Sequence, residues 1–102
     1  MSLLRHVVLF RWKDGTPAAA SRAIEEGFRA LPGKIAEIAD FEWGTDVSPE
    51  GLSQGFTHCF LVTFRDAKAR DAYLPHPAHK EFVALLEPSL EKALVVDYVA
   101  RD

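Results

Sequence analysis

The sequence predicts an α+β fold in which one four-stranded antiparallel sheet carries its helices on one face. Four segments alternate their side chains between two faces or are rich in β-forming residues, as strands are. Two longer segments repeat apolar residues every three or four positions, which indicates helices that bury one side. Their order along the 102 residues is β-α-β-β-α-β, the split βαβ arrangement of ferredoxin-like folds.

The first strand is expected over 3–12, where both faces are apolar in the middle. One face carries His6, Val8, Phe10 and Trp12, and the other carries Arg5, Val7, Leu9 and Arg11. The first helix is expected over 17–31, with Thr16 as its cap and Pro17 as its first residue. Its apolar stripe is Ala20, Ala23, Ile24, Phe28 and Leu31, while Arg22, Glu25, Glu26 and Arg29 are expected to face water.

The middle of the chain predicts two strands joined by a polar loop. In the second strand, 40–47, Phe41, Trp43 and Thr45 alternate with Glu42, Gly44 and Asp46. The loop is expected over 48–55. In the third strand, 56–64, one face carries His58, Phe60, Val62 and Phe64, and the other carries Thr57, Cys59, Leu61 and Thr63.

The last third of the chain predicts two helices and a closing strand. Asp66 is expected to cap a short helix that ends near Tyr73, before the helix-breaking sequence Pro-His-Pro. The last long helix is expected over 77–90, with apolar positions Phe82, Leu85, Leu86 and Leu90. The closing strand is expected over 93–99.

The sheet face that the helices do not cover is also apolar. We assign to it Val7, Leu9, Cys59, Leu61 and Val95. A monomer would expose this patch to water, and the simplest cover is the same face of a second copy about a two-fold axis. The sequence therefore predicts a homodimer in which two sheets meet as an α/β barrel.

Composition limits the classes of function. Residues 1–102 form one domain with a net charge of −3. No basic run is present, so we expect no nucleic-acid binding. No apolar run is long enough for a signal peptide or a membrane span. The single cysteine, Cys59, excludes an intrachain disulfide and fits a reducing, cytoplasmic location.

Several motifs together resemble the stress-responsive A/B barrel (Dabb) family. They are His-Val-Val-Leu-Phe at 6–10, Trp-Gly-Thr-Asp at 43–46, Gly-Phe-Thr-His at 55–58 and Val-Asp-Tyr at 96–98. The most specific is the Tyr-x-x-His-Pro-x-His block, Tyr73 to His79. The resemblance spans almost the whole chain and implies a dimeric ferredoxin-like fold.

The resemblance also implies a candidate site. A plant cyclase of that family closes a linear polyketide by aldol condensation with a histidine and a tyrosine, and the matching positions here are His79 and Tyr73. His6 and His58 match histidines that line the pocket of that enzyme. Phe28 stands where the cyclase has a pocket tyrosine, so the resemblance does not identify the substrate.

The alternation of side chains along the predicted strands also points to His6 and His58. His6 and His58 share the helix-facing side with Val8, Phe10 and Phe60, and we expect the two histidines to approach each other near one end of the sheet. His79 would act as base beside a carbonyl group and Tyr73 as hydrogen-bond donor to its oxygen. This chemistry needs no cofactor. The expected ligand is a small, largely apolar carbonyl compound, and the reaction would be a cyclisation, lyase or isomerase reaction.

A structural role for the same residues stays open, so the sequence does not decide whether the protein is an enzyme. His76 and His79 flank a proline at a helix start, and His79 could simply bond a backbone carbonyl. Asp97 is expected at a strand end, where an inward carboxylate could orient a partner group. A site filled by Phe10, Phe28, Phe60 and Phe82 would favour a non-catalytic binding or structural dimer. We expect no metal site, because Pro77 separates the two histidines of the block.

Overall fold

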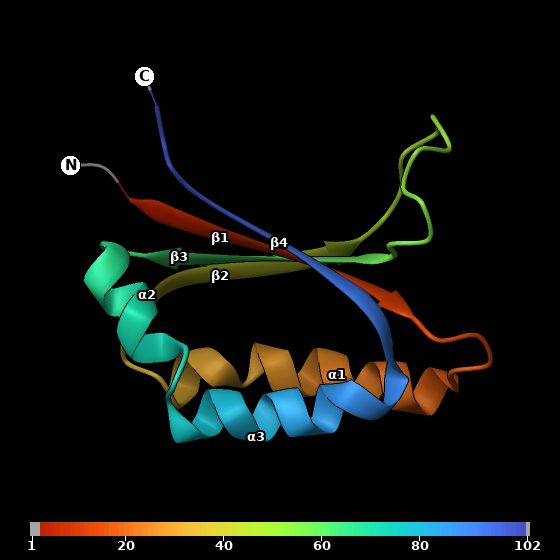
Figure 1. Cartoon of the computed structure of the whole chain (residues 1–102), viewed down its shortest axis with the longest axis horizontal. Helices are drawn as coiled ribbons and strands as arrows, with labels where there is room; N and C mark the ends of the chain where they lie inside the picture. Colours follow the sequence, from red (N-terminus) through yellow and green to blue (C-terminus); the bar gives the residue numbers. More distant parts are fainter. Residues whose placement is uncertain (1–2, 102) are drawn as a thin grey trace.

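The computed structural model describes residues 3–101 and has the predicted α+β, ferredoxin-like architecture (Figure 1). The strands, in one antiparallel sheet of order β2-β3-β1-β4, are β1 (Leu4–Trp12), β2 (Ile38–Thr45), β3 (His58–Phe64) and β4 (Leu90–Val99). The helices are α1 (Ala18–Arg29), α2 (Ala67–Tyr73) and α3 (Pro77–Leu86), with the short 3₁₀ helices η1 (Leu31–Gly33) and η2 (Glu87–Ser89). Figure 1 shows α1 and α3 side by side under one face of the sheet, with α2 at one end of the same face.

The core between the helices and the sheet is largely aromatic. Phe28 of α1 stacks on Phe60 of β3 with ring centroids 4.4 Å apart, and it lies 4.7 Å from Phe82 of α3. The other buried apolar residues of the cluster are Leu4, Val8, Phe10, Ile24, Leu31, Ile35, Val62, Phe64, Ala69, Tyr73 and Leu86. Burying one such large side chain contributes about 1.5–3 kcal/mol, so this cluster is what holds the helices on the sheet.

The predicted sidedness of β1 and β3 is confirmed. His6, Val8 and Phe10 are buried, whereas the alternate residues Val7 and Leu9 are only partly buried. β3 repeats the pattern, with His58, Phe60, Val62 and Phe64 buried on the helix side. We call the side opposite the helices the open face of the sheet.

The assignment of Val95 to the open face is wrong. In the pairing of β1 with β4, Val95 lies opposite Val8, and Val8 faces the helices. The residues opposite Val7, Leu9 and Arg5 are Val96, Leu94 and Tyr98, so these three carry the open face in β4. Consecutive apolar residues in β4 give no alternation from which a face could be read, and only pairing with β1 decides it.

The structure also corrects one cap and several boundaries, including that of β2, which spans Ile38–Thr45 instead of 40–47. α3 ends at Leu86, because Pro88 follows in η2, and Leu90 is the first residue of β4 rather than part of the helix. α1 ends at Arg29, and β3 begins at His58 instead of residue 56. The Thr16 hydroxyl donates to the carbonyl of Lys13 at 2.7 Å and does not cap α1.

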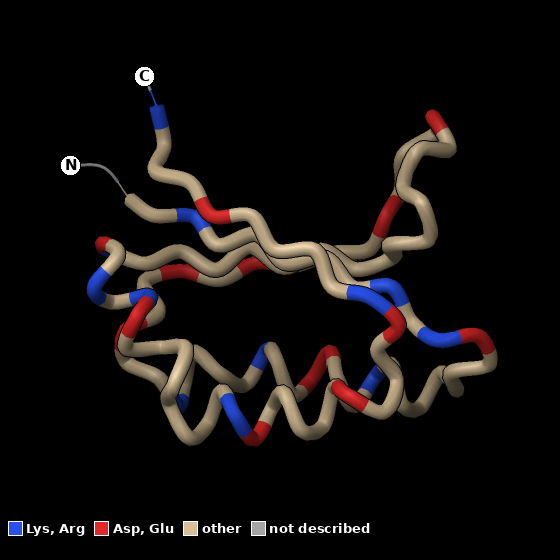
Figure 2. The backbone as a smooth tube through the Cα atoms, viewed as in Figure 1, with Lys and Arg blue, Asp and Glu red and all other residues tan. Residues whose placement is uncertain are grey.

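The surface of the described residues fits the predicted charge pattern. Figure 2 shows basic and acidic residues interspersed over the helices and the strand ends, with no long basic stretch. Among residues 3–101, no helix is both long and apolar enough to cross a membrane. The loop between β2 and β3 rises from the open face at one end of the sheet (Figure 1).

Candidate functional site

The four histidines do not converge on one site. In the antiparallel pairing of β1 with β3, His6 lies opposite Val62 and His58 lies opposite Phe10. Four residues of strand therefore separate the levels of His6 and His58, which is about 13 Å at 3.3 Å per residue. The expected approach of these two side chains is wrong, because the start of one antiparallel strand faces the end of its neighbour. Two separate clusters result.

The first, which we name the His79 cluster, consists of His6, Arg70, Tyr73, His79 and Asp97. Tyr73 is 1% exposed at the end of α2, and its ring lies close to both imidazoles. Its centroid is 4.5 Å from that of His79 and 5.8 Å from that of His6. The structure thus brings together His79, Tyr73 and His6, three of the four polar residues expected at the site.

His79 is held in one tautomer. Its Nδ1 lies 2.9 Å from the carbonyl oxygen of Leu74, which can only accept, so Nδ1 carries the proton and donates. The lone pair is then on Nε2. Burial lowers the pKa of His79 below its ordinary value, partly offset by this backbone hydrogen bond, and the neighbouring imidazoles of His6 and His76 lower it further. The neutral ring therefore presents a basic nitrogen at neutral pH.

Tyr73 supplies the complementary group. Burial strongly raises the pKa of its phenol, so the hydroxyl keeps its proton at any physiological pH. A protonated phenol in a water-poor environment is a hydrogen-bond donor suited to an oxygen that gains negative charge. The base and the donor are neighbours because one helical segment ends at Tyr73 and the next begins just before His79.

An ion-pair chain fixes His6. The Nδ1 of His6 donates to Oδ1 of Asp97 at 2.6 Å, and the other oxygen of Asp97 accepts from Nη1 of Arg70 at 2.9 Å. Burial by itself would raise the pKa of Asp97, but the hydrogen bonds from His6 and Arg70 outweigh burial and lower it. Asp97 is thus an inward carboxylate that orients a partner. The register of β4 places it opposite His6.

The second cluster, which we name the His58 cluster, lies at the other end of the same side of the sheet. Nε2 of His58 donates to Glu25 at 2.7 Å, and its Nδ1 lies 2.8 Å from the hydroxyl of Thr57. Ser21 donates to the same Glu25 oxygen at 3.1 Å. The imidazole packs beside the ring of Trp12, 4.9 Å away. The expectation that Glu25 faces water is wrong, because its side chain turns toward the sheet and is only 21% exposed.

His76 has a local structural role. Its Nδ1 accepts from the backbone N–H of Ala78 at 3.0 Å and caps the first turn of α3. This is the helix-start function that the sequence left open for the histidine pair. Among residues 3–101, no three His, Cys, Asp or Glu side chains are arranged as ligands for a metal ion.

The apolar residues expected to line the site form the aromatic core. Phe10 lies 5.4 Å from Phe60 and 6.2 Å from Phe28, ring centroid to centroid, and Val8 is buried in the same cluster. These rings occupy the space between α1, α3 and the sheet. A ligand at His79 therefore has little room for a long apolar chain between the helices and the sheet.

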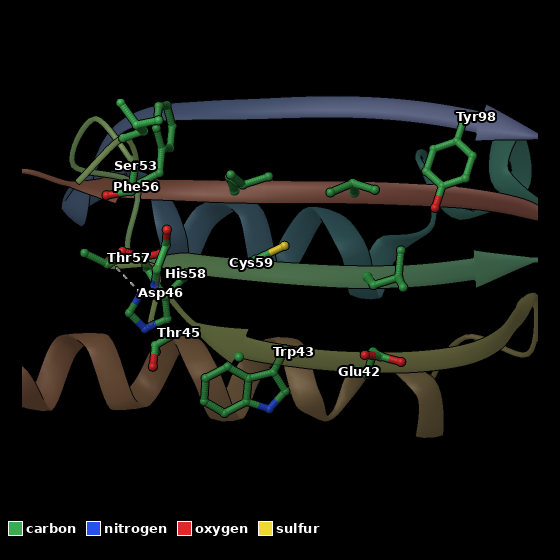
Figure 3. A pocket seen from close by; sticks show the side chains of 16 residues that line it. Glu42, Trp43, Thr45, Asp46, Ser53, Phe56, Thr57, His58, Cys59 and Tyr98 are labelled. Atoms are coloured by element: carbon green, nitrogen blue, oxygen red, sulfur yellow. Dashed lines mark hydrogen bonds between the residues drawn. The ribbon is translucent and has the colours of Figure 1, made fainter. Parts of the chain in front are cut away.

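The open face carries a hollow of about 660 Å³. Val7, Leu9, Cys59 and Leu61 form its floor, and the loop between β2 and β3 contributes Leu52 and Phe56. In Figure 3, Glu42 of β2, Cys59 of β3 and Tyr98 of β4 project from three strands of the sheet around it. The floor of the hollow thus consists of four of the five residues that the sequence analysis assigned to contact with a second copy.

Sequence reasoning missed Glu25 and Arg70. Glu25 was placed in water because it lies on the charged side of a helical pattern, one position after the buried Ile24. Arg70 belongs to a short helix in which four of seven residues are charged or aromatic, and no periodic signal separates its paired side chain from its exposed neighbours. Both make contacts with residues distant in the sequence, so no local signal could have found them.

Comparisons with known proteins identify the family of the chain. The family model described as Stress responsive A/B Barrel Domain matches residues 4–100. The chain is 41% identical over 95 residues to the Stress-response A/B barrel domain-containing protein HS1 of Arabidopsis thaliana, covering 93% of this chain and 87% of that protein. It is 30% identical over 98 residues to olivetolic acid cyclase of Cannabis sativa, covering 96% and 97%.

Solved structures show the same fold. A hydroxynitrile lyase from Passiflora edulis superposes with a TM-score of 0.90 at 27% identity, covering 98% of this chain and 94% of that one. A dimeric ferredoxin-like protein of unknown function from Jannaschia sp. CCS1 superposes with a TM-score of 0.79 at 29% identity, covering 94% and 97%. The proteins similar to this chain thus include a cyclase, a lyase and a dimer.

Proposed function

Because the chain belongs to the stress responsive A/B barrel domain family, we propose that it binds a small, largely apolar carbonyl compound and moves a proton beside the carbonyl without a cofactor. The observation that carries this proposal is the contact of Tyr73 with His79, whose Nδ1–H is bonded to Leu74 and whose Nε2 is left as a base. The similar cyclase and lyase support a reaction of the cyclisation, lyase or isomerase type.

In this mechanism His79 and Tyr73 are the catalytic residues. Nε2 of His79 takes a proton from the carbon next to the carbonyl group, and electrons shift onto the carbonyl oxygen. The Tyr73 hydroxyl donates a hydrogen bond to that oxygen and stabilises its negative charge. Proton return from His79 completes the cycle. Phe10, Phe28, Phe60 and Val8 form the apolar wall that limits the size of the ligand, and His6 binds a polar group of it.

Hydrogen–deuterium exchange tests the proposed chemistry without knowledge of the natural substrate. The protein is incubated in D₂O with a panel of small ketones and aldehydes, and loss of the hydrogens next to the carbonyl is followed by NMR. His79→Ala is expected to lower the exchange rate by about 100-fold or more, within the range of general base catalysis. If His79→Ala disturbs the fold, His79→Gln serves as the second variant.

The matched control is the other histidine of the same motif. His76→Asn removes an imidazole three positions from His79 but keeps a side chain that can cap α3, so exchange should stay near the wild-type rate. Absence of exchange above the buffer rate with every compound, or equal exchange in wild type and His79→Ala, would contradict the catalytic proposal.

The alternative function is a non-catalytic binding or structural dimer. Its supporting observation is the close packing of Phe28 with Phe60 and Phe82 at 4.4 and 4.7 Å, which leaves the core well filled. Under this alternative His79 serves only to join the end of α2 to the start of α3 through Leu74. The exchange experiment separates the two functions, because a structural histidine affects stability and not exchange.

We also propose that the protein is a homodimer through the open face. Leu94, Val96 and Tyr98 of β4 are 45%, 50% and 47% exposed there, next to the apolar floor of the hollow. Apolar patches of this kind on a sheet usually mark an interface, and the similar protein from Jannaschia is described as dimeric. The identical face of a second copy is the cover that two-fold symmetry supplies.

Sedimentation of a charged variant tests the dimer. Leu9→Glu places a carboxylate in the centre of the open face, where burial without a partner is strongly unfavourable, so a monomer is expected at micromolar concentration. Leu85→Glu is the control, because Leu85 is 45% exposed on α3 in the helix layer, away from the open face. A wild-type monomer, or a stable Leu9→Glu dimer, would show that the interface lies elsewhere.

We propose a cytoplasmic location as well. The only cysteine of the sequence, Cys59, is an exposed free thiol in the structure. A free thiol at the centre of the open face is compatible with a reducing compartment. Fractionation of cells that express the full chain tests this directly, and recovery in the secreted or membrane fraction would contradict it.

A further inference from the structure

The His58 cluster contains a chain of three side chains that ends at an exposed hydroxyl group. Nε2 of His58 lies 2.7 Å from Oε2 of Glu25, and an ionised carboxylate can only accept, so Nε2 carries the proton. In the neutral ring Nδ1 is then an acceptor, and the hydroxyl of Thr57 donates to it at 2.8 Å. The proton of this hydroxyl therefore points at a base whose other nitrogen is held by a carboxylate.

The arrangement is that of an activated nucleophile. In enzymes that transfer acyl groups through a hydroxyl or a thiol, a histidine accepts the proton of the nucleophile and a third group orients the histidine. Thr57 is exposed, whereas the side chains of His58 and Glu25 are only 7% and 21% exposed. The nucleophile can thus meet a ligand while the base and its orienting group are shielded from most of the solvent.

The exposed hydroxyl belongs to the hollow of the open face. Thr57 and His58 both line the hollow, at the end where the loop between β2 and β3 rises. Figure 3 shows both residues at this end, with Cys59 farther along the floor. Since the floor is apolar, it accommodates an apolar chain whose polar end lies near Thr57.

Thr57 lies beyond the apolar part of the open face that a second copy would cover. The apolar pair nearest to it is Leu9 with Cys59. Thr57 is two residues from Cys59, just as Arg11 is two residues from Leu9, and Arg11 pairs with Lys92 of β4. Charged residues are typical of the rim of an interface rather than of its core. We therefore expect the hydroxyl to lie at the edge of the proposed dimer interface.

We propose that Thr57 is the nucleophile of a second site, which hydrolyses small esters with an apolar acyl chain and does not involve His79 or Tyr73. Thr57 Oγ attacks the carbonyl carbon of the ester, and its proton moves to Nδ1 of His58. The bond from the carbonyl carbon to the alcohol oxygen breaks, and the alcohol leaves with the proton from Nδ1. The acyl group is then held on Oγ.

Water completes the reaction. Its oxygen attacks the acyl carbon while Nδ1 of His58 takes one of its protons. The bond between that carbon and Oγ breaks, Oγ takes the proton back from Nδ1, and the carboxylic acid leaves. Thr57 and His58 are the groups that touch the reacting atoms. Glu25 is a positioning residue, because it acts only through Nε2 of His58.

Hydrolysis of p-nitrophenyl acetate and p-nitrophenyl butyrate tests the proposal. The thiol of Cys59 lines the same hollow and is also a nucleophile, so the rates are compared in Cys59→Ala. In this protein Thr57→Val, which keeps the shape of the side chain without its hydroxyl, is expected to lower the rate above buffer by about 100-fold or more. Thr57→Ser keeps a hydroxyl and is expected to retain most of the rate.

The matched control is another threonine whose hydroxyl is bonded within the protein. The Thr16 hydroxyl donates to the carbonyl of Lys13 at 2.7 Å and has no histidine as its acceptor, so Thr16→Val should leave the rate unchanged. Tandem mass spectrometry of protein quenched soon after mixing should find the acyl group on Thr57. An acyl group only on other residues, or equal rates in Thr57→Val and its parent, would overturn the inference.

Glu25→Ala tests the positioning role. This variant should lower kcat and leave KM unchanged, because Glu25 orients His58 without touching the ester. Ring ¹⁵N shifts of His58 should report the Nε2–H tautomer in wild type and a mixture of tautomers in Glu25→Ala. An unchanged kcat in Glu25→Ala would overturn the assigned role of Glu25.

Discussion

The hydrogen bond between Glu25 and His58 should couple α1 to the sheet, and a double-mutant cycle can measure the coupling. The perturbation is Glu25→Ala and His58→Ala, singly and together. In the structure, Nε2 of His58 donates to Oε2 of Glu25 at 2.7 Å, and the two side chains are 7% and 21% exposed. The two residues lie 33 positions apart in the sequence, so the contact exists only in the folded chain.

The expected magnitude follows from burial and charge. A hydrogen bond that involves a charged group contributes about 1.5–3 kcal/mol to stability. Glu25 keeps some contact with water, and Ser21 also bonds its carboxylate at 3.1 Å, so Ser21 can replace part of the loss. We therefore expect a coupling free energy of about 1–2 kcal/mol, which straddles the lower limit of that range.

The assay is urea unfolding of the four proteins at one protein concentration, because the stability of a dimer depends on concentration. The same helix offers a matched control. Glu26 and Arg29 form an ion pair at 3.5 Å, but their side chains are 69% and 63% exposed. The equivalent cycle on this pair should give less than about 0.5 kcal/mol.

Two results would refute the reasoning. A coupling free energy for Glu25 and His58 within about 0.5 kcal/mol of zero would mean that their effects are additive. The contact would then add nothing beyond the separate packing of each side chain. A coupling for Glu26 and Arg29 equal to that of the buried pair would show that burial does not decide the magnitude.

Three further predictions concern single positions. His76→Ala removes the cap of α3 and should lower the free energy of unfolding by about 1 kcal/mol, as measured in urea. Gly55→Ala places a side chain on a residue at φ +83°, with its Cβ 2.7 Å from Cδ of Arg11. This variant should lower the free energy of unfolding by about 1–2 kcal/mol. Gly33→Ala, whose added Cβ would have no atom within 4 Å, should leave the free energy of unfolding nearly unchanged. Since the folded-state pKa of His79 is lowered, the unfolded chain binds its proton first as pH falls, so stability should drop below about pH 6.5. Urea unfolding of wild type and His79→Gln between neutral and mildly acidic pH checks this. The difference in free energy of unfolding between the two proteins should change with pH, and a difference that stays constant would contradict the prediction.

The helix-facing side of β1 and β3 could be predicted because the signal is local. Side chains of a strand alternate, so each strand could be divided into two series from its own residues, and the series with His6, Val8 and Phe60, which we assigned to the helix side, is the buried one. The Tyr-x-x-His-Pro-x-His block is also local, and its resemblance to the family motif implied that Tyr73 and His79 act together. The structure places their ring centroids 4.5 Å apart.

The buried face of β4 could not be predicted from its own residues. Leu94, Val95 and Val96 are consecutive apolar residues at an exposed edge strand, and either alternate set could face the helices. Pairing with β1 settles the question, because Val95 lies opposite Val8. The same pairing brings Asp97 opposite His6 and so completes the ion-pair chain with Arg70.

The sequence by itself determined the element order and the two-sided sheet, since these depend on periodicity, whereas the histidine–tyrosine pair was an expectation that the resemblance to a known family implied. Only the tertiary structure decided that His6 and His58 occupy opposite ends of the strand pair and that Glu25 and Asp97 are their carboxylate partners. The physical reason is register. Antiparallel pairing joins residues distant in sequence, and a shift of one position would exchange every contact across the sheet.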